Sequence, residues 1–336
     1  MKLAFILPGL PKPIGGFKFI YRLAEDLSKN HSVVVYHQSI DIGSVARLKY
    51  IILLRLNKFR RYPLETFNIK VRYLFNDASL LTFTHIYVCS WQLLKRNFSL
   101  IERSPNRFKH IVMDLPGYMG RAEDILYVWR NLKIEYFTIS NYLTEYFTDN
   151  VGGNVKYLGC LLPKVFKVDH SISRDIDVLM NYSTGSYKNS EMVVTISLEL
   201  RKLGLSVCLF GRESNSDLEN AGVIFIVNLN DEEISKIYQR SKVFVSISNF
   251  EGFGLPALEA IYYGAHLVTW DYFGNRDYLD DRIMSIVNGD EDLVEFIAGR
   301  VADVNCGKSF QRVESLNILS KWLKFSDAQF KVLLGL

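Results

Sequence analysis

The chain has 336 residues, of which 49% are hydrophobic and 23% charged, and its formal net charge is +4. This length allows two domains with separate cores, the composition excludes a disordered or fibrous chain, and no apolar run approaches the roughly 18 residues of a membrane-spanning helix. The 4 cysteines are scattered without a C-x-x-C pair, which argues against disulfides and thiolate metal sites and favours a cytosolic protein.

The N-terminal residues predict the opening of a Rossmann-like α/β domain. Residues 3–7 form an apolar run that is too short for a signal peptide and predicts a first strand. Gly15 and Gly16 then open a helix predicted from about residue 17 to 29, and residues 31–36 predict a second strand. A G-x-G-x-x-G pattern is absent, so we expect no dinucleotide site here. The two glycines either allow a tight turn or lie beside a ligand.

Residues 46–61 combine positive charge with hydrophobicity. They contain six basic and no acidic residues, interleaved with apolar ones. They belong to a basic half: residues 1–165 have 23 Lys and Arg against 12 Asp and Glu, whereas residues 166–336 have 17 against 24. Two interpretations stay open, a helix on an anionic membrane surface or a buried crossover helix with solvated basic ends. No stacking motif accompanies the charge, so we expect no nucleic-acid partner.

Residues 85–89 and 110–113 predict further strands of the first sheet. The second of these ends at Asp114, at the carboxyl end of a strand, where an open α/β sheet places ligand residues. Asp114 either binds a hydroxyl group or caps its loop. Residues 135–140 and 155–162 predict the last strands before a domain boundary near residues 163–173.

The second half of the chain repeats the alternation of strands and helices. Strands are predicted over residues 177–182, 206–210, 223–227 and 267–270, and helices over 190–203 and 315–336. The loops that follow the first three strands contain Ser183, Lys188, Arg212 and Leu229. Taken alone, a lysine after a strand is usually a solvated loop residue.

The stretch from Val243 to Gly264 is the most informative one. Residues 243–247 predict a buried strand, Glu251 and two glycines in three residues follow, and Pro256 is expected at the first position of a helix that Gly264 ends. Free N–H groups at such a turn and the dipole of the helix attract anions, phosphate in particular.

The segment EGFGLPALEA, with its glutamates in the spacing E-x7-E, resembles the nucleotide-sugar site of retaining glycosyltransferases of family 4, which have the GT-B fold. The resemblance implies an α/β protein with two Rossmann-like domains facing across a cleft. It implies an acceptor domain over 1–165, a nucleotide-sugar domain over 166–315, and a C-terminal helix over 316–336 that packs back on the first domain. The expected reaction moves a sugar from a nucleoside diphosphate sugar to a hydroxyl of a glycan or lipid-linked glycan, as in bacterial surface polysaccharide biosynthesis. No metal or other cofactor is expected.

The same resemblance assigns roles to individual residues. It implies that Glu251 binds hydroxyls of the donor sugar, that Glu259 binds the ribose, and that Lys188 binds the pyrophosphate. Gly15 and Gly16 would lie near the donor phosphate and the acceptor. The remaining donor contacts would come from the backbone at Leu229, Gly252, Phe253, Gly254 and Leu255.

Two positions depart from the family pattern. Met113 stands where many members have the histidine of a His-Asp pair, so only Asp114 is carried over; rhamnosyltransferase-like members with Gln-Asp are a closer parallel. Ser183 stands where an arginine is usual, and Arg212 lies in the right place to supply that charge. These losses keep an alternative open, a non-catalytic GT-B subunit that binds sugar nucleotide or glycan and partners an active transferase. A nucleotide-sugar 2-epimerase of the same fold is a further alternative.

Overall fold

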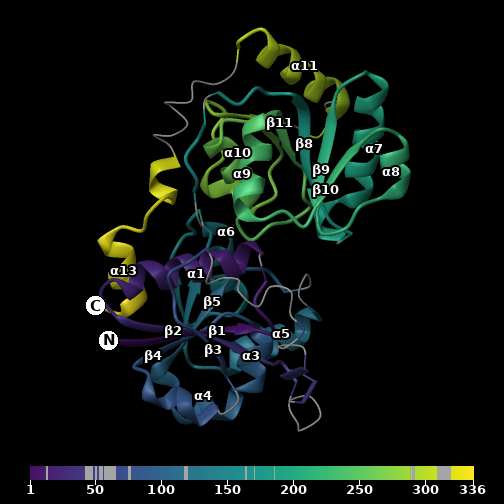
Figure 1. Cartoon of the computed structure of the whole chain (residues 1–336). Helices are drawn as coiled ribbons and strands as arrows, with labels where there is room; N and C mark the ends of the chain where they lie inside the picture. The colour runs from purple at the N-terminus through teal and green to yellow at the C-terminus, as the bar shows by residue number, and fades with distance from the viewer. Residues whose placement is uncertain are drawn as a thin grey trace. The chain divides into compact units, whose positions relative to one another are not determined.

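The computed structural model describes residues 1–12, 14–41, 48–49, 51–52, 56, 66–74, 77–116, 120–162, 165–169, 171–184, 186–287, 289, 292–308 and 319–336. The chain divides into two compact units (Figure 1). Unit 1 consists of Met1–Pro163 with Phe325–Leu336, and unit 2 of Lys164–Lys324. This division falls two residues before the boundary expected after residue 165.

Unit 1 is built on a parallel sheet of seven strands in the order β3-β2-β1-β4-β5-β6-β7. Residues 3–7, in the interior strand β1, are all fully buried, which is usual for a parallel strand covered on both faces. The strands are β1 (Lys2–Pro8), β2 (Ser32–Gln38), β3 (Val71–Leu74), β4 (His85–Val88), β5 (Phe108–Val112), β6 (Glu135–Thr138) and β7 (Asn154–Tyr157).

Helices cover both faces of this sheet (Figure 1). They are α1 (Gly15–Ser28), α3 (Trp91–Arg96), α4 (Phe98–Arg103), α5 (Ala122–Asn131), α6 (Asn141–Asn150) and α13 (Asp327–Leu334), with short 3-10 turns η1 (Asp77–Thr82) and η2 (Pro105–Arg107). Ala4 and Ile6 of β1 pack into one core with Leu93, Ile125 and Trp129. On the other face, Phe5 stacks on Tyr87 at 4.8 Å between ring centroids.

The C-terminal segment differs from the single helix expected over residues 316–336. In its described part, a 3-10 turn, η5 (Ser320–Trp322), precedes α13, and the two are separated by residues 323–326. The helix starts anew because Ser326 and Gln329 form a capping box, in which each side chain bonds to the backbone N–H of the other. The α13 helix packs on unit 1, where Tyr87 Oη donates to Leu333 O at 2.8 Å and Gln329 Nε2 to Leu158 O at 2.9 Å.

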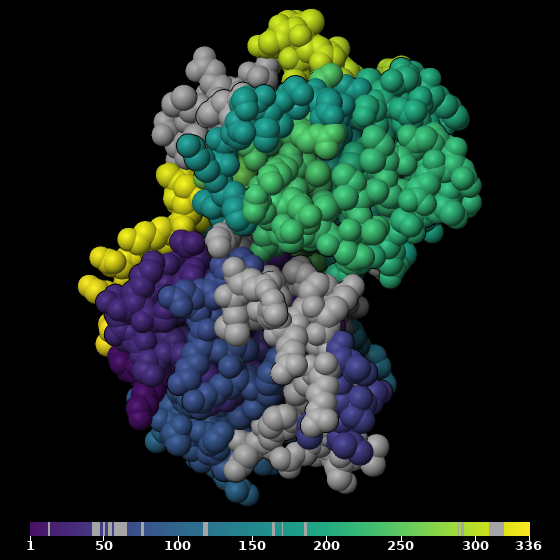
Figure 2. Space-filling view, viewed as in Figure 1, coloured from purple at the N-terminus to yellow at the C-terminus, as the bar shows by residue number. Residues whose placement is uncertain are grey.

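Unit 2 contains a parallel sheet of six strands in the order β10-β9-β8-β11-β12-β13. Its strands are β8 (Ile176–Tyr182), β9 (Val207–Gly211), β10 (Ile224–Val227), β11 (Ser241–Ser246), β12 (His266–Thr269) and β13 (Met284–Ile286). Its helices are α7 (Ser190–Lys202), α8 (Ser216–Asn220), α9 (Asp231–Arg240), α10 (Leu255–Tyr262) and α11 (Leu293–Asn305), with 3-10 turns η3 (Ser186–Lys188) and η4 (Gly274–Asp277). Figure 2 shows the surface of this unit, coloured from teal through green to yellow along the chain.

Two features predicted from the sequence lie wholly or largely outside the described residues. Most of residues 46–61, and Gly185 in the loop after β8, lie outside the described residues. Among the residues that are described, no helix has the length and apolar character needed to cross a bilayer.

Two histidines are buried in the sheet of unit 1, and their hydrogen bonds to described residues involve no acidic side chain. His37 Nδ1 bonds to Gly9 O at 3.1 Å and its Nε2 accepts from Tyr21 Oη at 2.8 Å, while His110 Nδ1 bonds to Val88 O at 2.6 Å. Burial lowers the pKa of His37 to about 3 and that of His110 to about 4. Both imidazoles are therefore neutral in the folded protein.

We predict that unit 1 loses stability as the pH falls below 6.5. The unfolded chain then binds protons that the folded one excludes, so each histidine removes about 2 kcal/mol of unfolding free energy by pH 5. Denaturant titrations between pH 8 and pH 4.5 measure this. His37→Gln, referenced to its own stability at pH 8, should reduce the slope by about 1.4 kcal/mol per pH unit; an unchanged slope would contradict the assignment.

Candidate functional site

The loop between β11 and α10 forms the centre of the candidate site in unit 2. Val243, Phe244 and Val245 are buried, as the predicted strand requires. The helix begins at Leu255, so Pro256 occupies its second position rather than the expected first. A proline is tolerated there because N–H groups of the first turn have no partner within the helix. At the other end, Gly264 follows the helix with a φ of +86°, the left-handed conformation that ends helices.

Gly254 caps the start of α10 in a conformation that only glycine adopts easily. Its φ is +87°, and a Cβ atom would lie 2.2 Å from Tyr272 Oη and 2.5 Å from Tyr278 Oη. Tyr278 Oη donates to Gly254 O at 3.0 Å, and the two tyrosine hydroxyls lie 2.7 Å apart. These buried tyrosines, which sequence reasoning missed, therefore fix the first turn of the helix.

A second glycine brings another chain segment against the same loop. A Cβ atom on Gly274 would lie 2.1 Å from Glu251 O and 2.6 Å from the carbonyl carbon of Gly252. Next to it, Phe273 pairs with Glu251 in a β-bridge and has a φ of +71°. The backbone from Glu251 to Gly254 is thus held on two sides.

The start of α10 has donors to offer to an anion. Within the described part of the chain, the backbone N–H groups of Phe253, Gly254 and Leu255 donate to no acceptor. The Phe253 side chain is 1% exposed and packs on Tyr278 and Trp322, at centroid distances of 5.4 Å and 5.0 Å. The Phe253 side chain is therefore committed to packing, and only its backbone could contact a ligand.

Lys188 and Glu251, which are 63 residues apart in sequence, form an ion pair in the structure. Their side chains are only 17% and 16% exposed. Ser248 Oγ donates to the same carboxylate oxygen, Glu251 Oε1, at 2.8 Å. The pair adjoins a cavity of about 20 Å³, room for roughly one water molecule.

The turn that carries Lys188 is attached to the end of β11. Asn249 N donates to Tyr187 O at 2.8 Å, and Asn189 Nδ2 donates to Ile247 O at 3.3 Å. Asn189 has a φ of +54°, a left-handed conformation that asparagine tolerates better than most residues. These bonds explain how Lys188 comes to lie beside the loop.

Glu259 lies in the second turn of α10 and is half-buried. Tyr238 Oη donates to Glu259 Oε2 at 3.4 Å. Burial raises the pKa of Tyr238 well above its usual value, and the charge of Glu259 adds to the shift. The tyrosine therefore stays protonated and acts as a donor that orients this carboxylate.

Ser183, Arg212 and Leu229 follow three adjacent strands. The register pairs Tyr182 with Gly211 and Gly211 with Val227, so β8, β9 and β10 all end at one edge of the sheet. Arg212 is exposed and forms no ion pair with another described residue. A hydrogen bond of 3.3 Å from Thr184 Oγ1 to Glu213 Oε2 connects the first two loops. The structure thus places all three candidates at the carboxyl edge, where β11 also ends.

The candidate residues of unit 1 meet at the carboxyl edge of its own sheet. Gly15 is the first residue of α1 and is exposed. A Cβ atom on Gly16 would lie 3.2 Å from Met113 Sδ, so Gly16 contacts the residue that precedes Asp114. Asp114 is half-buried and follows β5.

Part of the chain is similar to known transferases in sequence. Residues 210–300 match the family described as "Glycosyl transferases group 1". A putative glycosyltransferase, ORF378, of Acidianus filamentous virus 2 is 28% identical over 99 residues, which are 29% of this chain and 24% of that protein. The GtfA subunit of the UDP-N-acetylglucosamine–peptide N-acetylglucosaminyltransferase of Streptococcus gordonii is 28% identical over 97 residues, 27% of this chain and 19% of that protein. The chain therefore covers less than a quarter of each of these relatives.

The whole chain is similar to solved structures. HepE of Anabaena, in complex with UDP and glucose, aligns with a TM-score of 0.74 and 15% identity over 100% of both chains. At this identity the likeness concerns the fold alone. Together with the two parallel α/β units of Rossmann type, it confirms the expected GT-B fold, and the segment 210–300 that is similar to group 1 glycosyl transferases contains the entire β11–α10 loop.

Proposed function

We propose that this protein is a glycosyltransferase that moves a sugar from a nucleoside diphosphate sugar to a hydroxyl of a glycan or lipid-linked glycan. The observation that carries the proposal is the loop from Ser248 to Gly254. It places the Glu251 carboxylate and a helix start, whose N–H donors bond to no described residue, at the carboxyl edge of a parallel sheet, and Lys188 of a neighbouring turn pairs with that carboxylate. This edge is where α/β proteins bind nucleotides.

The diphosphate would bind at the start of α10. The N–H groups of Phe253–Leu255 and the dipole of the helix supply fixed positive potential, and the Lys188 ammonium adds a full charge. Arg212 would take the part of the arginine that Ser183 replaces, with the Ser183 hydroxyl as a neutral donor. Such preorganised donors also stabilise the charge that develops on the leaving diphosphate, which is usually the largest contribution to catalysis.

The two glutamates would bind the neutral parts of the donor. Glu259, oriented by Tyr238, is suited to accept hydrogen bonds from the ribose diol, and Glu251 from hydroxyls of the sugar. The nucleotide base would contact the backbone near Leu229. Because HepE is described with UDP and glucose, and GtfA is named for a UDP-sugar, uridine nucleotides are the first to try.

We infer a retaining reaction without a metal ion. The bond between the anomeric carbon and the phosphate oxygen breaks, the acceptor oxygen bonds to the same face of that carbon, and the acceptor proton moves to the leaving phosphate. No second carboxylate is then needed as a nucleophile. Gly15, Gly16 and Asp114 would serve the donor phosphate and the acceptor hydroxyl, and the acceptor belongs to bacterial surface polysaccharide assembly on the cytoplasmic side of the membrane.

We also propose peripheral contact with an anionic membrane through residues 46–61. Among their described residues, Leu48, Ile52 and Leu56 are helical, four residues apart, and 59%, 48% and 74% exposed. Side chains at this spacing share one helix face, and the basic residues of the segment suit an anionic lipid surface. A lipid-linked acceptor would be presented at that surface.

The reaction is tested with purified protein, a panel of UDP-, GDP- and dTDP-sugars, and a lipid-linked glycan extract. We expect acceptor-dependent release of one nucleoside diphosphate and, by NMR, a product with the anomeric configuration of the donor. Glu259→Ala should weaken binding of that nucleoside diphosphate by about tenfold or more, because a charged hydrogen bond is worth about 1.5–3 kcal/mol. An inverted product would refute retention, and binding without turnover would favour the non-catalytic subunit.

The backbone anion site is tested by Gly254→Ala. A side chain there must displace two buried tyrosine hydroxyls, so we expect the unfolding free energy to fall by about 1–3 kcal/mol and the nucleoside diphosphate affinity to fall with it. Gly204→Ala is the matched control, because Gly204 has a similar φ of +82° but open space around its Cβ position. Equal effects of the two substitutions on affinity would contradict the assignment.

Membrane contact is tested by co-sedimentation with vesicles. We expect binding to phosphatidylcholine vesicles that contain 30% phosphatidylglycerol, roughly the anionic lipid needed for a strong surface potential, and little binding to pure phosphatidylcholine. The double variant Ile52→Asp, Leu56→Asp should lose at least about tenfold in binding, since each apolar side chain contributes about 1.5–3 kcal/mol. Leu203→Asp, at a site that is 58% exposed in unit 2, is the control. Equal loss in both would refute the proposal.

A further inference from the structure

The carboxylate of Glu251 is shared between two partners of different kinds. Lys188 Nζ and Ser248 Oγ both bond to Oε1, while Oε2 accepts no bond within the described part of the chain. On the proposed function, which this inference extends, the lysine and the glutamate bind different parts of one donor molecule. In the structure they are paired with each other.

The two partners of Glu251 differ in how firmly they are held. Ser248 is 6% exposed, and its carbonyl accepts a bond of 2.7 Å from Trp270 Nε1, so its position is fixed by the packing. Lys188 reaches the carboxylate through a flexible chain of four methylene groups, and its ammonium can turn to another anion without any change in its backbone. The turn beneath it is meanwhile anchored through Tyr187 and Asn189.

The low exposure of both charges makes an exchange of partners necessary. A charge that is more than four-fifths removed from water is costly to leave without a counter-charge or hydrogen bonds. When a diphosphate takes over Lys188, Glu251 keeps only the bond from Ser248 and needs new donors. The hydroxyls of a sugar attached to that diphosphate are such donors.

We propose that the ion pair between Lys188 and Glu251 is the resting state of an exchange that the diphosphate drives. The phosphate takes Lys188, and Glu251, retained by Ser248, is released to bind the sugar through its free oxygen. Ser248 is then a positioning residue for the donor sugar. Glu251 therefore regains a full set of hydrogen bonds only when the diphosphate and the sugar are parts of one molecule.

The exchange has an unusual consequence: Glu251 competes with the nucleoside diphosphate for Lys188. Removing the charge of Glu251 should therefore strengthen binding of a nucleoside diphosphate while it weakens the additional contribution of the sugar. Removing the Ser248 hydroxyl should leave the affinity for nucleoside diphosphate within about twofold, and reduce only the preference for the sugar-bearing form.

The experiment compares UDP, GDP and dTDP, with and without attached sugar, by isothermal titration calorimetry on the full chain. For the nucleotide that binds wild type, we expect Glu251→Gln to tighten nucleoside diphosphate binding by about threefold to tenfold, in the range of a partly screened ion pair. Ser248→Ala should raise KM for the sugar donor and Ser248→Thr should restore it. Thermal unfolding of each variant establishes that it is folded.

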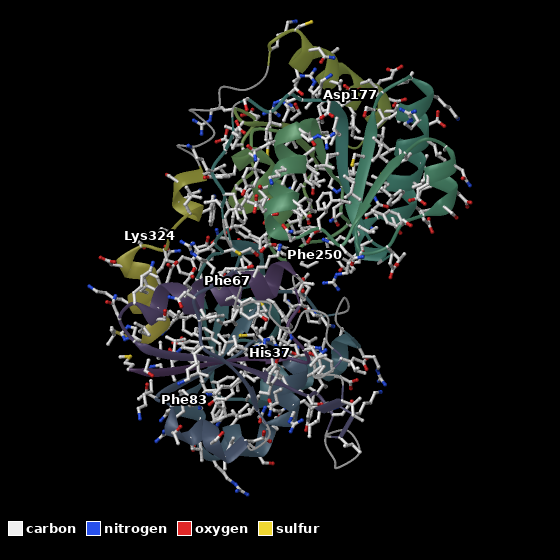
Figure 3. All side chains as sticks on the ribbon, viewed as in Figure 1. His37, Phe67, Phe83, Asp177, Phe250 and Lys324 are labelled. Atoms are coloured by element: carbon white, nitrogen blue, oxygen red, sulfur yellow. The ribbon has the colours of Figure 1, made fainter. Side chains whose placement is uncertain are left out.

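Two controls separate the exchange from a general loss of negative charge. Asp177→Asn removes the carboxylate of another ion pair of unit 2, with Lys242 at 2.6 Å and 20% and 18% exposure, and should leave binding unchanged. Figure 3 shows Asp177 at the end of unit 2 opposite to Phe250, the neighbour of Glu251. In a Lys188→Met background, Glu251→Gln should no longer tighten binding; a gain that persists there would mean simple charge repulsion and overturn the proposal.

Two further outcomes distinguish failure of the proposed function from failure of the exchange. If none of the three nucleoside diphosphates binds wild type, the proposed function itself fails. If one binds wild type but binds Glu251→Gln equally or more weakly, the exchange is refuted while the function stands.

Discussion

The site of unit 2 depends on two places where backbone approaches backbone or a hydroxyl too closely for any side chain. At Gly274 the backbone packs against the backbone of Glu251 and Gly252. At Gly254 the start of α10 packs against the hydroxyls of Tyr272 and Tyr278. Because both contacts are made by buried groups, the loop between them has little freedom. Its N–H groups and the carboxylate of Glu251 are therefore held in place before any ligand binds, which avoids the cost of ordering them.

Local patterns in the sequence predict much of this arrangement. The apolar runs of β1, β8 and β11 are buried strands, and Gly264 ends its helix as expected. Signals that depend on distant partners are not visible: Tyr278 holds Gly254 from 24 residues away, and Lys188 meets Glu251 from 63 residues away. The edge strand β3, with the sequence VRYL, is short and only partly buried, so it has no apolar run to reveal it.

The C-terminal segment shows why hydrophobic spacing alone misleads. Apolar residues at near-helical spacing predict one helix from residue 315 onward. Ser326 and Gln329 instead satisfy the N–H groups of a new helix start, and Phe325 turns to pack on Phe19 at 6.3 Å between ring centroids. An N-cap contributes about 1 kcal/mol at a single position, which favours a helix start at this point of the chain. The S-x-x-Q signal was present in the sequence and carried more information than the spacing.

The charge of unit 2 explains why its binding groups must be so specific. Unit 2, Lys164–Lys324, contains 23 acidic against 17 basic residues, yet the proposed donor is an anion. The long-range field of this unit therefore repels the ligand, although salt screens that field beyond about 8 Å. In the proposed site, attraction must come from groups within contact distance, which are the start of α10, Lys188 and Arg212. With so few cations, it matters that Lys188 is also the partner of Glu251. On the proposed exchange, the same ammonium neutralises the carboxylate and binds the diphosphate. On the proposed exchange, an arginine in place of Ser183 would matter most once Lys188 has moved from Glu251 to the diphosphate, because the charge of the diphosphate exceeds what one ammonium can balance.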